Sequence, residues 1–131
     1  MNFINLLPID VTYAPNGDMD KAIVFPKSGL VARLTTNTGV QKTIGEMKLN
    51  VFVQQPLGEL YTIDFGVDDI PENRNAFPEP TNDIVYIVNI VVAQKLTGRK
   101  DVISPAAGNW GVIRDGSKII AVTHFNQFEV D

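Results

Sequence analysis

Apolar and polar positions alternate along most of the chain with the period of two that is typical of half-buried β-strands. The clearest example is residues 48–54, Lys-Leu-Asn-Val-Phe-Val-Gln, where the alternation indicates one buried face and one wet face. Turns that contain glycine or proline separate these runs. We expect strands at residues 2–6, 9–13, 21–25, 30–35, 40–44, 48–54, 60–65, 84–88, 111–114 and 117–123.

Two of the turns favour hairpins. Pro15-Asn16-Gly17-Asp18 tolerates positive φ and separates residues 9–13 from residues 21–25. Asp115-Gly116 is a preferred two-residue turn between the last two apolar runs. Together these patterns predict a mainly β fold, either an antiparallel β-sandwich or a small barrel-like fold.

One short α-helix is expected after the buried strand at residues 84–88, which is rich in β-branched and aromatic side chains. Asn89 is a favourable helix N-cap, and Gly98 stands where a glycine commonly ends a helix. These residues predict a helix from Asn89 to about Leu96. The alternative is one long strand over residues 84–92.

Residues 66–83 contain three prolines and five acidic side chains, which predicts an extended surface loop. Long loops of this kind are often functional or mobile. Only 48 residues follow it, from Ile84 to Asp131, which is short for a second domain. We therefore expect a single β-rich domain over residues 1–131.

Composition narrows the possible functions. The 131 residues are 44% hydrophobic and 20% charged, which is ordinary for a globular protein, and no cysteine is available for disulfides or zinc. The net charge is −4 with only 11 Lys and Arg, so duplex nucleic acid is not an expected partner. The N-terminus lacks the features of a secretory signal, and the longest apolar stretch, residues 84–93, falls short of the roughly 20 residues of a membrane span. We expect a soluble, cytoplasmic protein with no membrane partner.

Candidate catalytic residues are sparse, and we expect neither an enzyme active site nor a cofactor. His124 is the sole histidine, whereas zinc sites and nucleophilic triads require several partners. The acidic side chains suggest two alternatives, a hard-cation site in a metal-dependent hydrolase or a solvated loop without the spacing of a calcium loop. These side chains are Asp64, Asp68, Asp69, Glu72 and Glu79.

Trp110, the single tryptophan, lies between Gly108 and Gly111. In such a loop it serves either as a binding platform or interface anchor, or as a side chain that closes one end of the fold.

The best candidate for ligand binding is a polar cluster. Arginine presents a planar fork that matches phosphate or carboxylate, and the start of a helix at Asn89 favours an anion. Arg99 and Lys100 lie past the other end of that helix, about 15 Å away, so neighbouring subunits are one way to unite them. Alternatively, Arg99 and Asp101 pin their turn by a salt bridge. The candidate residues are Arg33, Asn89, Arg99, Lys100, Asp101 and Arg114, with Trp110 beside them.

Short motifs spread over most of the chain carry a resemblance. They are Asn5-Leu6-Leu7-Pro8; Pro26-Lys27-Ser28-Gly29-Leu30-Val31-Ala32-Arg33; Tyr86-Ile87-Val88-Asn89-Ile90-Val91-Val92-Ala93; Arg99-Lys100-Asp101-Val102-Ile103-Ser104-Pro105; and Arg114-Asp115-Gly116 before Ile119-Ile120. The sequence resembles a family of small uncharacterised proteins, many of them from bacteriophages, prophages and bacteria. It departs from that family at Asn89, where Ser is favoured, at Ala121-Val122, where Gly-Cys is usual, and by extra residues near 73–80.

The resemblance implies an accessory role for a phage or mobile element, inside the host cytoplasm. Some proteins of that setting sequester or inhibit the signals of host defence, and this step is analogy. Three functions follow as hypotheses: a non-enzymatic protein that binds a small anionic, nucleotide-like ligand, a structural or protein-interaction module of a virion or complex, and a metal-dependent hydrolase. The partner is accordingly a small anion or a host or phage protein, and exposed strand edges favour a homo-oligomer.

Overall fold

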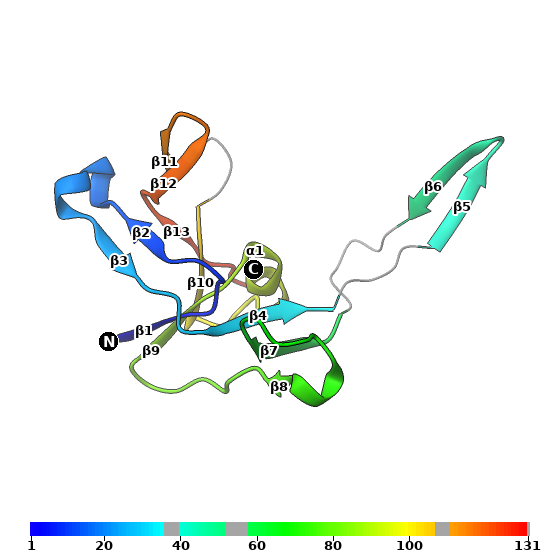
Figure 1. The fold of residues 1–131 in the computed structure, drawn as a ribbon, viewed down its shortest axis with the longest axis horizontal. Coiled ribbons are helices and arrows are strands. Elements are labelled where there is room, and N and C mark those ends of the chain that lie inside the picture. Colours follow the sequence, from blue (N-terminus) through cyan, green and yellow to red (C-terminus); the bar gives the residue numbers. More distant parts are fainter. Residues whose placement is uncertain (36–39, 52–57, 107–110, 131) are drawn as a thin grey trace.

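The structure is a computed structural model that describes residues 1–35, 40–51, 58–106 and 111–130 (Figure 1). In this part of the chain the fold is mainly β with one α-helix, which confirms the predicted fold class, and the described strands close no barrel. The turn expected at residues 36–39, the strand end at 52–54 and the loop with Trp110 lie outside the described residues.

The central sheet has the order β1-β9-β10-β13. Strand β9 pairs in parallel with β1 and with β10, and β13 is antiparallel to β10. Parallel neighbours require a crossover between distant segments, so local alternation did not indicate these pairs. The strands are β1 (Asn2–Asn5), β9 (Ile84–Ile87), β10 (Val102–Pro105) and β13 (Phe125–Asn126).

The segment around β9 is buried on both faces, which explains its continuous apolar sequence. Tyr86 and Val88 belong to one core cluster, whereas Ile87 between them belongs to a second cluster. The prediction of a buried central strand is therefore confirmed.

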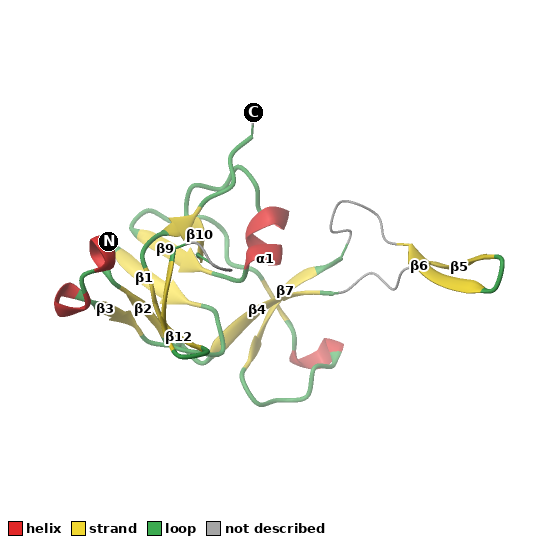
Figure 2. Ribbon diagram, turned by 90° about the horizontal axis from the view of Figure 1, so that it is seen from above, coloured by secondary structure: helices red, strands yellow, loops and turns green. Residues whose placement is uncertain are grey.

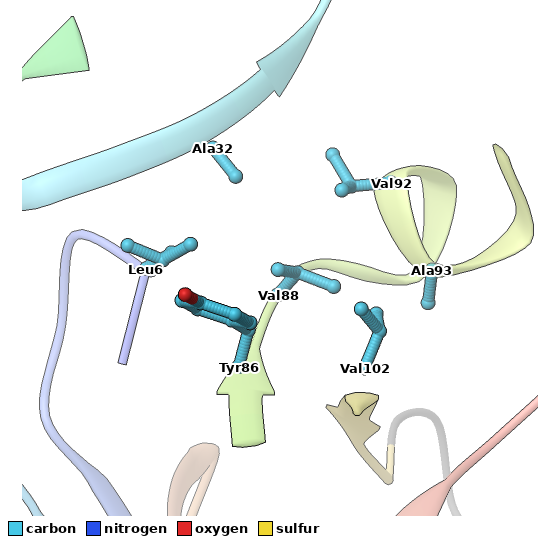
Figure 3. Close-up of a cluster of buried hydrophobic side chains, with 7 residues drawn as sticks. All are labelled: Leu6, Ala32, Tyr86, Val88, Val92, Ala93 and Val102. Carbon is cyan, nitrogen blue, oxygen red and sulfur yellow. The ribbon is translucent and has the colours of Figure 1, made fainter. Parts of the chain in front are cut away.

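The helix α1 (Ile90–Lys95) and the strand β4 (Leu30–Leu34) cover one face of the central sheet. Val92 and Ala93 of α1 and Ala32 of β4 pack around Val88 in this cluster (Figure 3). The Asn89 side chain accepts a hydrogen bond from the Val92 N–H at 2.9 Å, so the predicted N-cap is confirmed and a single long strand is excluded.

A second sheet, in the order β11-β12-β2-β3, covers the other face through Val11 and Val122, which pack with Ile87. Both predicted hairpins form, but Asp115 pairs with Lys118, so the loop of the second hairpin is residues 116–117 rather than 115–116. The strands are β2 (Val11–Tyr13), β3 (Ile23–Phe25), β11 (Val112–Asp115) and β12 (Lys118–Val122), with 3₁₀ turns Pro15–Gly17 and Met19–Lys21 between β2 and β3.

The third sheet consists of β4, β7 (Leu60–Asp64) and β8 (Asn75–Ala76). Strand β8 and the 3₁₀ turn Pro71–Asn73 lie inside the predicted surface loop, so part of that loop forms an edge strand on β7. This sheet carries Arg33 and Tyr61, two side chains of the candidate site.

The hairpin of β5 (Val40–Ile44) and β6 (Met47–Val51) lies apart from the other strands (Figures 1 and 2). At its turn Ile44 is 68% exposed and Met47 is 64% exposed, although both are large and apolar. None of the described helices is long and apolar enough to cross a bilayer.

Candidate functional site

The strand pair β4–β7 brings the first two side chains of the site together. Arg33 on β4 lies directly opposite Tyr61 on β7 in the antiparallel register. Opposite residues of such a pair project from the same face with their Cβ atoms about 5 Å apart. Arg33 is exposed, whereas Tyr61 is buried.

A close backbone approach fixes the ends of these two strands. The Thr35 hydroxyl accepts a hydrogen bond from the Glu59 N–H at 2.6 Å, and a Cβ on Gly58 would lie 1.8 Å from the Thr35 carbonyl oxygen. No side chain other than that of glycine fits there, and this contact holds the strand ends at the rim of the site.

The loop after β7 folds back over Tyr61. The Asp69 carboxylate accepts a hydrogen bond from the Tyr61 hydroxyl and pairs with Arg74, whose Nε lies 2.8 Å from its Oδ1. The Arg74 guanidinium carbon lies 4.3 Å from the centre of the Tyr61 ring, within the range of a cation–π contact. Arg74 is held by the carboxylate at one nitrogen and by the ring below.

Electrostatics keep these groups in fixed charge states. The hydrogen bonds from Tyr61 and then from Arg74 lower the pKa of Asp69. Burial, followed by the hydrogen bond to Asp69, raises the pKa of Tyr61, and the hydrogen bond to Asp69 raises the pKa of Arg74. At neutral pH the site therefore contains an ionised pair beside a neutral tyrosine.

A cavity of about 560 Å³ lies between these side chains and the start of α1. Small-molecule sites commonly have volumes of about 300–1,000 Å³. Ile90 and Val91 are 41% and 46% exposed and form an apolar part of the cavity wall, the apolar ledge. The cavity is lined by residues 33–35, Tyr61, Asp69, Arg74 and residues 89–91.

Arg33 and Asn89, two of the residues singled out from the sequence, line this same cavity. Among the described residues, the Arg33 guanidinium makes no hydrogen bond or ion pair. Asn89 caps α1 and donates to the Ala32 carbonyl oxygen at 3.4 Å. Because α1 has only six residues, the positive charge of the cavity comes from arginine side chains rather than from the helix.

Arg99, Lys100 and Asp101 lie elsewhere. All three guanidinium nitrogens of Arg99 are engaged, Nε and Nη2 with Asp101 at 2.9 and 2.6 Å and Nη1 with the Pro78 carbonyl oxygen at 3.0 Å. Its hydrogen bonds to Asp101 lower the pKa of that carboxyl group. Arg99 and Lys100 line a separate cavity of about 350 Å³ with residues 127–130. The salt bridge that pins the turn, one of the two alternatives, is therefore present.

The remaining candidates do not join this cavity. Arg114 lies on β11, where its Nη1 approaches the Ser117 carbonyl oxygen at 3.5 Å. His124 is partly buried, with Nδ1 3.5 Å from the Thr123 hydroxyl. Trp110 lies outside the described residues. In the described part of the chain, no three His, Asp or Glu side chains gather where they could hold a metal ion.

Sequence reasoning missed three members of the site. Tyr61 belongs to a strand and is indistinguishable from an ordinary core residue, and Asp69 was considered only as a cation ligand. Arg74 offered a usable signal, because it is the single cation in the otherwise acidic segment 66–83.

Comparison with known proteins gives no match. No protein-family model matches the sequence, and neither a curated protein nor a solved structure matches it. The functional argument therefore rests on the geometry of the site.

Proposed function

We propose that this protein is a non-enzymatic binding protein that sequesters a small anionic, nucleotide-like ligand in the cavity between β4, β7 and α1. The observation that carries this proposal is the Arg33 guanidinium, which faces solvent at the cavity without a protein partner among the described residues. A charged group with unsatisfied donors beside an open cavity is an anion-binding feature.

The two sides of the cavity match the two parts of such a ligand. Arg33 and Arg74 suit the anionic group, and the ledge of Ile90 and Val91 suits a flat apolar part such as a base. With Asp69 counted, the side chains of the cavity carry a net charge of about +1, against −4 for the whole chain. The cavity is thus a locally positive spot on an acidic protein. The proposal includes what the resemblance implies, namely an accessory role for a phage or mobile element that acts against host defence signals.

Isothermal titration calorimetry with AMP and with adenosine tests the proposal. We expect AMP to bind and adenosine to bind at least tenfold more weakly, because adenosine lacks the anion. Arg33→Gln should lower AMP affinity at least tenfold. Lys100→Gln removes one positive charge from the other cavity and is the matched control, with AMP affinity unchanged.

Absence of AMP binding at millimolar concentration would reject the proposal for nucleotides. A loss of AMP binding in Lys100→Gln rather than in Arg33→Gln would show that AMP binds at the Arg99 turn instead. Chromatography of AMP after overnight incubation should return it unchanged, and conversion to another compound would show that the protein is an enzyme.

The β5–β6 hairpin favours a second candidate, a protein-interaction module with a host, phage or identical partner. Ile44 and Met47 expose apolar surface at its turn, and a hairpin outside a larger sheet is only marginally stable in water. A partner that covers this turn would bury both side chains.

Photocrosslinking tests this second candidate. A benzophenone amino acid at position 44 should give a discrete crosslinked species in the cell, whereas the same group at exposed Lys21 should not. Identical results from the two positions would reject the hairpin as an interaction element.

A further inference from the structure

Arg74 forms an ion pair but uses few of its guanidinium N–H donors. Its Nε pairs with Asp69, and Nη1 and Nη2 make no hydrogen bond among the described residues. Its guanidinium lies over the Tyr61 ring, and its side chain is only 24% exposed. Arg74 is therefore held in place while two of its nitrogens still have donors to offer.

We infer that Arg74 is a second anion-binding residue beside Arg33, and that the pair is built for the terminal phosphate of a phosphomonoester. This inference rests on the proposed function and names the chemical class that the cavity selects. Asp69 and Tyr61 act on the ligand only through Arg74, as positioning residues.

The two arginines line the same cavity and are both neighbours of Tyr61. Arg33 lies opposite Tyr61 across the strand pair, and Arg74 stacks on the ring of that same tyrosine. Both guanidinium groups also contribute to the electrostatic environment of Tyr61 and of Asp69. The tyrosine ring thus has one guanidinium on its strand neighbour and one above its face.

The number of ligand oxygens and the ligand charge favour one class of anion for two such groups. A terminal phosphate presents three non-bridging oxygens, so it can accept hydrogen bonds from two guanidinium groups at once. A phosphodiester has only two non-bridging oxygens and a carboxylate has two oxygens, so two guanidinium groups must share fewer acceptor sites on these anions. A terminal phosphate also carries a charge of about −1.5 to −2 near pH 7, which complements two arginines better than a single charge does.

Arg74 also lines a neighbouring hollow of about 270 Å³ that contains Glu59. Phosphate is repelled by that carboxylate, whereas the larger cavity has Arg33 in its wall. The distribution of charge therefore favours binding of the phosphate in the larger cavity, beside Arg33.

Calorimetry with AMP and with 3′,5′-cyclic AMP, a phosphodiester, tests the inference. We expect AMP to bind at least tenfold more tightly than cyclic AMP. Arg74→Lys keeps the charge but loses the planar fork, so it should weaken AMP about tenfold and reduce the preference over cyclic AMP. Equal affinities of the wild type for the two ligands, or normal AMP binding by Arg74→Lys, would overturn the inference and leave the proposed anion site standing.

Asp69→Ala tests the positioning role. This change makes the cavity more positive, so a purely electrostatic Asp69 predicts tighter binding of both ligands, and more so of the doubly charged AMP. A positioning Asp69 predicts a smaller ratio of AMP to cyclic AMP affinity, because Arg74 loses its orientation. An unchanged or larger ratio would contradict the role.

Glu59→Gln tests which of the two cavities holds the phosphate. AMP affinity should stay within about twofold of wild type if the phosphate lies beside Arg33. A tenfold gain in Glu59→Gln, together with normal binding by Arg33→Lys, would place the phosphate in the smaller hollow and overturn the shared site. Thermal unfolding of each variant, matched to wild type, shows that losses of binding are not losses of fold.

Discussion

Two arginine–aspartate pairs among the described residues look alike in structure but differ in how many arginine nitrogens they use. Arg99 pairs with Asp101 and lies 5.2 Å from the Phe77 ring centre, and Arg74 pairs with Asp69 and lies 4.3 Å from the Tyr61 ring centre. Arg99 uses Nε, Nη1 and Nη2 in hydrogen bonds to the protein, whereas Arg74 uses Nε alone among the described residues.

The difference illustrates what separates a structural arginine from the binding arginine that we propose. An arginine whose nitrogens are all bonded to the protein stabilises the fold and has little left for a ligand. An arginine held at one nitrogen and one face is fixed in orientation and still able to donate. Each prediction below tests this difference between Arg99 and Arg74.

The largest expected effect is on stability, in Arg99→Met. The substitution leaves the Asp101 carboxylate, 14% exposed, and the Pro78 carbonyl oxygen without their donor. We expect the free energy of unfolding to fall by about 2 kcal/mol in urea denaturation at pH 7. Lys100→Met, at the exposed neighbour, should change it by less than about 0.5 kcal/mol. Equal effects of the two substitutions would show that the Arg99 network contributes nothing.

The same pair predicts an acid dependence. The hydrogen bond from Arg99, together with its charge, lowers the pKa of Asp101 from its ordinary value of 3.8. A carboxyl group whose pKa is lower in the folded state contributes stability above its ordinary pKa and loses it as pH falls through the folded value. The unfolding free energies of wild type and Arg99→Met should therefore differ by a constant amount from pH 7 to about 4 and converge below that. A difference that stays constant down to pH 2.5 would contradict this.

Asn89 sharpens the comparison, because it lines the cavity but already has a structural role. Its Oδ1 caps α1, so Asn89→Ala should lower the free energy of unfolding by about 1 kcal/mol. Asn89→Asp keeps the acceptor and should recover most of that loss while placing a negative charge beside the cavity. Asn89→Asp should thus keep most of the stability but bind AMP more weakly than Asn89→Ala does. If stability and AMP affinity fell together in both variants, the structural role and the effect on the cavity could not be told apart.

The elements predictable from sequence were those that local chemistry specifies. Alternation located most strands, the cap at Asn89 located the helix, and the turn signals located both hairpins. The β-branched run at residues 84–88 identified the central strand, because burial on both faces leaves no polar position.

What depends on distant partners was not predictable. The parallel pairing of β9 with β1 and β10 unites segments that no turn connects. Arg33 and Asn89 were both suspected, but their common cavity exists because β4 and α1 pack on the same sheet face. The Asp69–Arg74 ion pair forms only because the loop folds back on Tyr61, so the sequence did not predict it. Arg99 and Asp101 are two residues apart, and their salt bridge was one of the predicted alternatives.

The smallest expected effect is on the stability of Arg74→Met. Asp69 is 42% exposed and remains hydrogen-bonded to Tyr61 when Arg74 is removed, so no buried charge is left without a partner. Solvent-screened ion pairs contribute little, and we expect the free energy of unfolding to fall by only a small fraction of the loss in Arg99→Met. Urea denaturation beside Arg99→Met makes the comparison direct, since the same chemical change is made at both arginines. A loss at Arg74 as large as that at Arg99 would mean that this arginine also stabilises the fold, and the distinction between the two pairs would fail.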